Sequence, residues 1–329
     1  MSPTFTIVIP TVNREELLRR AVASALNQTV PTRVLVSDNG STDGTQAFLA
    51  SLEHPLLTKK RIEPTISAQS HGRRLQEWLE TEWAVFLSDD DCLDINFMAA
   101  IQATLAEHPT AVIVYSRAMV HMWDVAYPGA AGPGEEEGWE FFQAFLEGKR
   151  EPTWCAMALR RQDLLDAGPQ PEERIIGDMF FWIRIAAKGT VACCPRPLSH
   201  YWYLHAALDN VTSGTPLRTW ARECRVQAAE MEERILRNGQ GRAMPLGQLR
   251  RLERGFIARS CANQVLWNAI RGRSRWALVQ DVVRCLPLFL AWPSVWARVI
   301  GGCVLPKRLI RWRVEAVVRK KAGRPVPAP

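Results

Sequence analysis

The chain has 329 residues, of which 47% are hydrophobic and 23% are charged. This length and composition allow one large domain with an appendage and do not favour intrinsic disorder. Eight cysteines without a CxxC pair or a zinc-type histidine spacing indicate neither a disulfide framework nor a structural zinc site. Residues 1–5 show no basic segment followed by an apolar run, so we expect no export and a cytoplasmic location.

The net charge of +7 is divided unevenly along the chain. Residues 1–241 carry 23 Lys and Arg against 31 Asp and Glu, a net charge of −8. Residues 242–329 carry 18 against 3, a net charge of +15. A basic tail of this kind attracts nucleic acid or the anionic lipid of a cytoplasmic membrane face. The pattern of apolar residues in the tail is the evidence that distinguishes between these two partners.

Strands and helices are predicted to alternate over the first 115 residues. Residues 5–10 and 33–38 are short apolar runs typical of buried strands, and residues 15–28 between them have helical spacing. The turn-rich residues 39–44 lead into a helix that ends near residue 52. The next predicted elements are helix 71–82, strand 83–88, helix 94–107 and strand 111–115. This order predicts an α/β fold with a mostly parallel sheet covered by helices.

The pattern loosens between residues 123 and 152. Residues 127–134 are rich in Gly and Pro, which predicts a mobile loop, and an acidic helix is expected around residues 135–146. Three tryptophans flank the loop and are expected either to pack in the core or to stack on an acceptor: Trp123, Trp139 and Trp154. The last elements predicted before residue 204 are a helix at 179–188 and short strands at 190–194 and 198–203.

The C-terminal region has a different pattern. Residues 246–282 are helical in spacing and rich in arginine, and residues 285–306 are almost entirely apolar and nearly as long as a membrane span. Arg298 near the middle of this run, together with two prolines, argues against a simple spanning helix. A basic cluster at residues 307–324 follows directly. This combination predicts an anchor on an anionic membrane surface, with a buried core helix or a nucleic-acid-binding tail as alternatives.

Three consecutive carboxylates, Asp89, Asp90 and Asp91, follow a predicted strand. Like charges about 4 Å apart repel by roughly 1 kcal/mol in water and by several times more near a protein surface. We therefore expect a divalent cation, or a polyphosphate with its metal, at this place. The alternative is a solvated turn that caps the next helix.

Polar groups also follow the first two predicted strands, at residues 11–14 and 38–43. In an open α/β sheet, ligands bind beyond the carboxyl ends of the strands, so these groups are expected to share one site with the carboxylates. The chain has no GxGxxG after the first strand and no GxxxxGK[ST] sequence. A phosphate group would therefore be held through a metal.

Four motifs follow one another along the chain: residues 7–14 (IVIPTVNR), 36–45 (VSDNGSTDGT), 86–93 (FLSDDDCL), and Gly177-Asp178 with the FWIR sequence that ends at Arg184. Together they resemble the ordered motifs of family-2 glycosyltransferases with the GT-A fold. The resemblance implies an inverting, metal-dependent enzyme of the hexosyltransferase type. It would move a sugar from a nucleotide-diphospho-sugar donor to an acceptor hydroxyl, in the synthesis of cell-surface polysaccharide or glycolipid.

The resemblance also implies roles for single residues. The donor-binding positions are Pro10, Thr11, Arg14, Asp38, Asn39, Ser41, Asp89 and Asp90. Of these, Asp38 is suited to accept a hydrogen bond from a base N–H. Asp38 at a turn is otherwise a common capping residue.

The family's DxD motif falls on the Asp89–Asp91 run and holds the ribose and a Mg²⁺ or Mn²⁺ ion on the diphosphate. The literal spacing assigns Asp89 and Asp91, whereas alignment on the preceding Phe-Leu assigns Ser88 and Asp90. Asp90 and Asp91 are therefore both candidate metal ligands. His205 is a third, because its surroundings resemble the family's Tyr-Arg-x-His tail, although isolated histidines are more often structural.

Asp178 matches the family's catalytic base. A carboxylate there would remove the proton of the acceptor hydroxyl as it attacks the anomeric carbon, which gives direct displacement with inversion. The alternative is that Asp178 caps the helix that follows it. The family usually has an acidic residue before this aspartate, and here the residue is Gly177.

The expected organisation is a GT-A domain at residues 1–215 and a helical, basic region at residues 216–329 that lies on the inner face of the cell membrane. The expected partners are the nucleotide-sugar donor, a saccharide or lipid-linked acceptor and an anionic membrane surface, and no nucleic acid. One alternative is a sugar-1-phosphate nucleotidylyltransferase, whose Gly-rich, Arg-containing loop is absent after the first strand. Another is a non-catalytic protein that binds nucleic acid through the tail, which leaves the four motifs unexplained.

Overall fold

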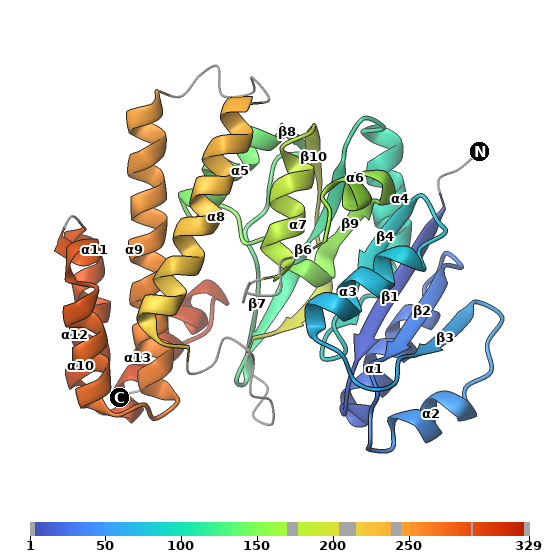
Figure 1. Ribbon diagram of the computed structural model, residues 1–329, viewed down its shortest axis with the longest axis horizontal. Coiled ribbons are helices and arrows are strands. Elements are labelled where there is room, and N and C mark those ends of the chain that lie inside the picture. The colour runs from blue at the N-terminus through green and yellow to red at the C-terminus, as the bar shows by residue number, and fades with distance from the viewer. Residues whose placement is uncertain (1–3, 170–176, 204–214, 238–244, 291, 326–329) are drawn as a thin grey trace. The chain divides into compact units, whose positions relative to one another are not determined.

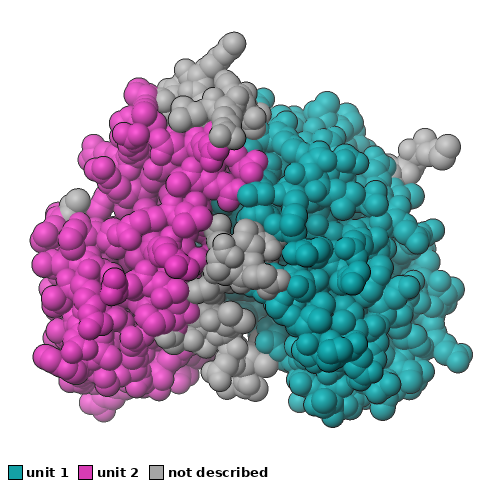
Figure 2. Space-filling model, in the orientation of Figure 1, with its two compact units in different colours: residues 1–121, 128–141, 150–203 teal, residues 122–127, 142–149, 204–329 magenta. Residues whose placement is uncertain are grey.

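The computed structural model describes residues 4–169, 177–203, 215–237, 245–290 and 292–325. The chain divides into two compact units (Figure 2). The first, called the sheet unit, comprises residues 1–121, 128–141 and 150–203. The second, called the helical unit, comprises residues 122–127, 142–149 and 204–329. Each unit is described by itself.

The sheet unit is built around strands in the order β3-β2-β1-β4-β9-β6-β10-β5 (Figure 1), and β8 pairs with β10. The strands are β1 (Phe5–Thr11), β2 (Arg33–Asp38), β3 (Leu57–Arg61), β4 (Trp83–Phe86), β5 (Cys92–Leu93), β6 (Ile113–Met122), β8 (Glu135–Glu137), β9 (Met157–Arg160) and β10 (Thr190–Trp202). This architecture confirms the predicted α/β class.

The first half of the sheet is parallel. β1 pairs with β2 on one side and with β4 on the other, and β2 pairs with β3. Thr11 lies opposite Asp38 in the register, so β1 and β2 end level with each other. β4 ends at Phe86, opposite Val8, and the chain then continues toward Asp89 along the same edge. The register therefore brings the polar ends of three strands together.

The second half of the sheet is mixed. β9 is antiparallel to both β4 and β6, β10 is parallel to β6, and β5 is antiparallel to β10. The predicted strands 190–194 and 198–203 form one continuous strand, β10, whose register shifts at Pro197. Proline cannot donate to the ladder, which explains why the sequence pattern indicated a break there.

Among the strands that the sequence patterns missed, β3 and β9 share a common reason. β3 lies at the edge of the sheet and has the largely exposed sequence LTKKR, so it contains no apolar run. β9 is only four residues long and directly follows a 3₁₀ helix at Trp154–Ala156. Both gain their strand conformation from neighbouring strands rather than from their own residues.

The sheet unit contains these helices: α1 (Glu15–Leu26), α2 (Thr45–Ser51), α3 (Ala68–Glu77), α4 (Phe97–Glu107), the first residues of α5 (Gly138–Leu146), α6 (Arg161–Asp166) and α7 (Gly177–Ala186). α1 buries Leu18 and Val22 in a core shared with Ile7 of β1. Burial of each such side chain stabilises the fold by about 1.5–3 kcal/mol. α3 begins three residues earlier than predicted because the Ser67 hydroxyl caps it by accepting from the Ser70 N–H at 3.1 Å.

The helical unit contains α8 (Leu217–Arg237), α9 (Leu246–Ile270), α10 (Arg275–Arg284), α11 (Leu286–Leu290), a 3₁₀ helix (Pro293–Val295), α12 (Trp296–Val304) and α13 (Lys307–Lys321). The strand β7 (Val125–Pro128) overlaps the loop predicted at residues 127–134 only in its last two residues. The core of the helical unit is centred on α9, where Cys261 and Val265 pack with Phe289 and Val299.

The apolar run at residues 285–306 is therefore divided between α11, a 3₁₀ turn and α12. Its inward-facing side chains, among them Phe289, Val295 and Val299, are fully buried in the core of the helical unit. Within the described ranges, no helix has both the length and the apolar character that crossing a bilayer requires. Core packing accounts for part of the apolar run, and its exposed residues remain for a surface role.

Part of the positive charge of α13 is used inside the helical unit. Arg319 donates to Asp124 at 2.7 Å, and the guanidinium of Arg311 lies 5.3 Å from the ring centre of Trp123. Trp123 also lies 6.4 Å from the ring of Trp267. Trp123 thus packs inside the protein, in agreement with the core alternative considered for it.

Candidate active site

The centre of the site is formed by the ends of β1 and β4 and by the start of α1. The Thr11 hydroxyl donates to Asp89 Oδ2 at 2.7 Å, and Arg14 donates from Nη1 to Asp89 Oδ1 at 2.9 Å. The same Nη1 lies 3.7 Å from Asp90 Oδ2. One arginine therefore compensates two of the three consecutive carboxylates, and it precedes Asp89 by 75 residues in the sequence.

The three carboxylates differ in their surroundings. Only 5% of the Asp89 side chain is exposed, against 24% for Asp90. Burial raises the pKa of the Asp89 carboxyl above its ordinary value, whereas Arg14 and Thr11 oppose the shift. Asp90 is thus the carboxylate with more access to a ligand.

Asp91 is buried, and its carboxylate binds the backbone of β10. Its Oδ1 accepts a hydrogen bond from the backbone N–H of Trp202 at 3.1 Å, and its own N–H donates to Ser88 O at 3.1 Å. Burial raises the pKa of the Asp91 carboxyl well above its ordinary value, and the charge of Asp90 acts in the same direction. Asp91 therefore ties the carboxylate loop to β10.

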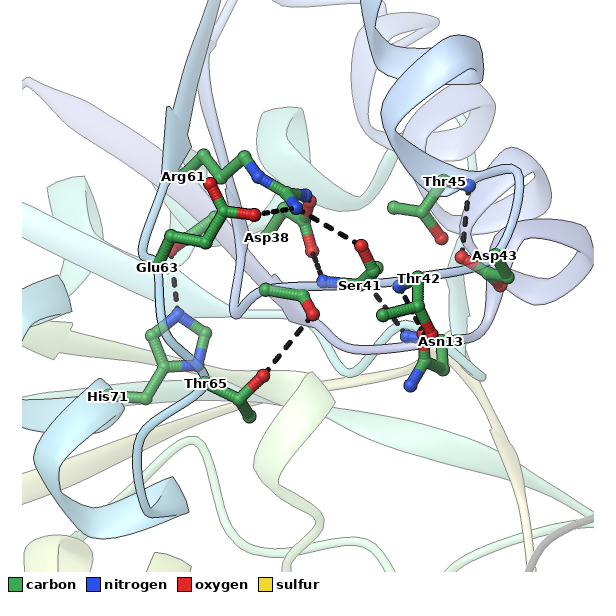
Figure 3. Close-up of polar contacts among 12 residues, drawn as sticks. Asn13, Asp38, Ser41, Thr42, Asp43, Thr45, Arg61, Glu63, Thr65 and His71 are labelled. Carbon is green, nitrogen blue, oxygen red and sulfur yellow. Dashed lines mark hydrogen bonds and ion pairs between the residues drawn. The ribbon is translucent and has the colours of Figure 1, made fainter.

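Asp38 lies at the end of β2, where two groups fix its carboxylate (Figure 3). Oδ1 accepts from the Ser41 N–H at 2.9 Å, and Oδ2 forms an ion pair with Arg61 from the end of β3. Arg61 also donates to Ser41 O at 3.1 Å and to Glu63 Oε1 at 2.7 Å. The buried carboxylate is therefore held in a single orientation by a neighbouring strand.

The first two motifs are joined through Asn13 (Figure 3). Its backbone N–H donates to Ser41 Oγ at 2.8 Å, and its Oδ1 accepts from the Thr42 N–H at 2.7 Å. Asn13 adopts a left-handed conformation with φ 53°, which asparagine tolerates better than most residues. The loops after β1 and β2 are thereby locked together at the carboxyl edge.

Asn39 has a supporting position. Its amide binds the backbone of Ile66, donating to the carbonyl at 2.9 Å and accepting from the N–H at 3.1 Å. Its own N–H donates to Thr11 O at 2.9 Å. The side chain predicted to contact the donor thus holds the loop that follows β3.

Sequence reasoning did not find Arg61, Glu63 and His71. The His71 ring lies 2.6 Å from the Ser37 hydroxyl, and burial lowers the pKa of His71 below its ordinary value. Arg61 lies at the end of the polar edge strand β3, so no pattern of apolar residues marked its place. The one available signal was the cluster of opposite charges at Arg61 and Glu63.

Asp178 is the second residue of α7, and its side chain lies outside the described part of the structure. Three residues further on, the ring of Phe181 lies 6.0 Å from that of Trp154, which in turn lies 5.0 Å from that of Phe86 at the end of β4. This aromatic stack links α7 to the strand that precedes the carboxylates. Both neighbours of Trp154 are core residues, which favours packing over acceptor stacking. His205 lies outside the described residues.

The carboxylate oxygens at this edge of the sheet suit a Mg²⁺ or Mn²⁺ ion that is held jointly by the protein and a bound ligand. Among the described residues, no three His, Cys, Asp or Glu side chains form a cluster that could hold a metal ion. A hard cation of this kind is usually bound by one or two carboxylates, and phosphate oxygens and water supply the other ligands. The partly exposed Asp90, beside the engaged Asp89, has the chemistry for such a shared site.

Residues 6–167 match the family model described as Glycosyl transferase family 2. The fold and this match define a glycosyltransferase. Residues 6–167 of the chain therefore belong to glycosyl transferase family 2, and the chain has the GT-A fold. The search of curated proteins found no match.

Three solved structures show the same fold. The crystal structure of S. aureus TarS 1–349 in complex with UDP-GlcNAc is 14% identical, with a TM-score of 0.63 over 95% of this chain and 92% of that chain. TarS 1–349 in complex with UDP gives a TM-score of 0.60 at 14% identity with the same coverage. The mannosyltransferase PcManGT from Pyrobaculum calidifontis, in complex with GDP-Man and Mn²⁺, is 17% identical, with a TM-score of 0.52 over 92% of this chain and 87% of that chain.

Proposed function

We propose that the protein is an inverting, metal-dependent glycosyltransferase that uses a nucleotide-diphospho-sugar donor. The observation that carries the proposal is the convergence of Thr11, Arg14 and Asp89 at the carboxyl edge of the sheet, with Asp90 on its more open side. Two proteins with the same fold are complexed with UDP-GlcNAc and GDP-Man, which supports a nucleotide sugar as donor.

Asp38 is proposed to bind the nucleobase. A carboxylate has about four lone-pair sites, and Ser41 and Arg61 occupy one on each oxygen. A second site on either oxygen can accept a base N–H. Because Arg61 also binds Glu63, it holds the Asp38 carboxylate in place before the donor arrives, which lowers the cost of ordering on binding.

Asp90 is proposed to be the carboxylate that shares a Mg²⁺ or Mn²⁺ ion with the diphosphate. Asp89 is already engaged by Thr11 and Arg14, and Asp91 is buried against Trp202. When bound, the cation would neutralise negative charge on the departing nucleoside diphosphate. Arg14, beside both Asp89 and Asp90, orients the two carboxylates and adds positive charge at the same edge.

Asp178 is proposed as the general base that accepts the proton of the acceptor hydroxyl during in-line attack on the anomeric carbon. Its place in the first turn of α7 favours the ionised carboxylate, because the positive end of the helix dipole stabilises negative charge by about 0.3–1 kcal/mol. Direct displacement inverts the anomeric configuration. The acceptor is proposed to be a saccharide or a lipid-linked sugar in cell-surface polysaccharide or glycolipid synthesis.

We assign transfer to residues 1–215 and a location on the cytoplasmic face of the membrane to residues 216–329. The net charge of +15 over residues 242–329 supports an anionic membrane as partner. The acidic balance of residues 1–241 gives no support to a nucleic-acid-binding track on the first domain.

The reaction is tested by the stereochemistry of the product. The full-length protein would be incubated with Mn²⁺, a nucleotide sugar and a saccharide acceptor, and the anomeric proton of the new linkage would be followed by NMR. We expect the configuration opposite to that of the donor, and no product after addition of EDTA. Retention of configuration, or equal rates in EDTA, would contradict inversion or metal dependence respectively.

A further inference from the structure

The outer helices of the helical unit present large apolar side chains to solvent. In α10, Trp276 is 71% exposed and Val283, seven residues later on the same helix face, is 62% exposed. In α12, Ile300 and Val304 are one turn apart and are 53% and 57% exposed. Core packing does not account for these four residues, because none of them belongs to the buried cluster.

These exposed residues share one side of the unit. α10 and α12 pack against α9 and against each other (Figure 1). The opposite faces of both helices are buried in the core through Leu278 of α10 and Val299 of α12. Since both inner faces point toward α9, the two outer faces lie next to each other on the solvent side. They form one surface, here called the outer apolar surface.

The charges around this surface have one sign. Residues 245–325 contain three carboxylates, and none of them is exposed. Glu253 and Asp281 are buried, and Asp281 pairs with Arg273 at 2.8 Å. Glu315 pairs with Arg319 at 2.9 Å. No acidic side chain within this described range is fully exposed, and the exposed cations Arg275, Arg284, Lys307 and Arg308 belong to none of the ion pairs found among the described residues.

The exposed cations lie close to the outer apolar residues in sequence. They include Arg275 and Arg284 at the two ends of α10, and Lys307 and Arg308 directly after α12. Arg275 precedes Trp276, and Arg284 follows Val283. A cation thus lies beside the exposed apolar residues of each helix.

We infer that the outer apolar surface docks on an anionic lipid bilayer, with Trp276, Val283, Ile300 and Val304 in the headgroup–acyl boundary and the flanking cations on lipid phosphates. The inference rests on the membrane location in the proposed function and identifies the residues that make the contact. Tryptophan beside lysine and arginine suits this boundary because its ring is both apolar and able to donate a hydrogen bond.

The combination distinguishes a bilayer from other partners. Nucleic acid phosphates pair with cations, but they provide no apolar environment that would bury the four exposed aliphatic and indole side chains. A second copy of the chain would bring the same positive charge to the same surface, and like charges oppose that contact. An anionic bilayer satisfies both the apolar and the cationic residues.

Co-sedimentation of the full-length protein with vesicles tests the inference. We expect binding to an equimolar mixture of phosphatidylglycerol and phosphatidylcholine, and much weaker binding to phosphatidylcholine alone. The triple variant Trp276→Ser/Val283→Ser/Ile300→Ser should bind at least roughly tenfold more weakly, because it loses most of the buried apolar area. Arg275→Glu and Arg284→Glu should each weaken binding by at least roughly fivefold.

A matched control keeps the test specific. Ile95 and Val226 are also exposed, at 52% and 41%, but lie outside the outer apolar surface. The variant Ile95→Ser/Val226→Ser should bind vesicles like the wild type. Equal loss in this control and the triple variant would overturn the inference. Wild-type binding to neutral vesicles as tight as to anionic vesicles would also overturn the inference. The same holds if the wild type binds no vesicles and the triple variant loses self-association.

The test separates the surface from the enzyme activity. The triple variant should keep its unfolding midpoint and its affinity for nucleotide sugars, because the changed residues are exposed and belong to the helical unit. A wild-type protein that binds donors but not vesicles would overturn the docking surface and leave glycosyl transfer intact. A protein that binds vesicles but no nucleotide sugar would overturn the proposed activity and support the surface.

Discussion

In the sheet unit, charged groups pair with one another across long stretches of sequence, whereas the outer helices of the helical unit expose charges of a single sign. Arg14 joins Asp89, and Arg61 joins Asp38, each at a strand end. In the helical unit, Asp281 and Glu315 each pair with an arginine, while Arg275 and Arg284 are exposed.

The difference indicates two kinds of binding. Paired, buried charges fix the orientation of polar groups, which a site for one small ligand requires. Unpaired charges of one sign attract an extended surface of the opposite sign and require no fixed geometry. This difference is the one expected if the sheet unit binds the proposed nucleotide-sugar donor and the outer helices dock on the proposed membrane surface.

The largest expected effect comes from the proposed base. Asp178→Asn should lower the transfer rate by roughly 10²–10⁴-fold, because a neutral amide cannot accept the acceptor proton. Donor binding should change little, since the amide keeps the shape of the carboxylate. Initial rates of sugar transfer and a donor titration measure the two effects. A variant that transfers at nearly the wild-type rate would remove Asp178 from the mechanism.

The next effect separates two neighbouring carboxylates. Asp90→Asn should weaken Mn²⁺-dependent donor binding by at least roughly tenfold, because it removes the accessible ligand. Asp91→Asn should retain the Mn²⁺ effect, because Asp91 is buried and accepts from the Trp202 N–H. Calorimetric titration of a donor with and without Mn²⁺ compares the variants. The reverse result would assign the metal to Asp91.

A smaller effect is expected at the pair that orients Asp38. Arg61→Ala should lower the free energy of unfolding by about 2 kcal/mol, because it leaves a buried carboxylate short of a partner. Arg33→Ala is a matched control, since the Arg33–Glu80 pair is 3.5 Å apart and largely exposed and should contribute less than about 0.5 kcal/mol. Urea unfolding measures both. Equal losses of unfolding free energy in the two variants would show that Arg61 does not stabilise the buried carboxylate of Asp38.

The smallest predicted effect is an opposite pH dependence in the two units. In the sheet unit, burial lowers the pKa of His121 from 6.5 to about 4, so its contribution to stability is lost as the pH falls from 6.5 toward 4. In the helical unit, burial raises the pKa of Glu253 from 4.5 to about 7, so its contribution is lost as the pH rises from 4.5 toward 7. Each effect should be about 1 kcal/mol, because solvent screens part of the shift.

Urea unfolding between pH 4 and pH 8 measures these slopes. His121→Gln should reduce the loss of stability on the acid side, and Glu253→Gln should reduce the loss toward neutral pH. His121 packs at 2.9 Å from His200, so His200→Gln serves as a second variant of the same pair. A His121→Gln slope identical to that of the wild type would show that this histidine is not buried in neutral form.

Sequence patterns predicted the parallel half of the sheet well because its strands are continuous apolar runs. β2 was predicted with the bounds that the structure shows, and β1 to within one residue. They could not predict β3, whose polar residues have no apolar period, or the passage of β10 through Pro197. Strand pairing supplies the missing information in both cases.

The sequence motifs likewise predicted that Thr11, Arg14 and Asp89 share one site, but they did not predict the contacts among these residues. That Arg14 compensates Asp89 and Asp90 depends on the register of β1 with β4, which no local pattern specifies. The apolar run at residues 285–306 could be read as membrane-facing or buried because hydrophobicity alone is the same for both. The packing of Phe289 and Val299 in the core around α9 identifies part of the run as core, whereas Ile300 and Val304 are exposed.

The central claim, a metal-assisted nucleotide-sugar site at the carboxyl edge of the sheet, is tested most directly by calorimetric titration of the full-length protein with a panel of UDP- and GDP-sugars, with and without Mn²⁺. We predict that at least one nucleotide sugar binds at least roughly tenfold more tightly with Mn²⁺ than in EDTA. The failure of every nucleotide sugar to bind, or equal affinity in Mn²⁺ and EDTA, would contradict the claim.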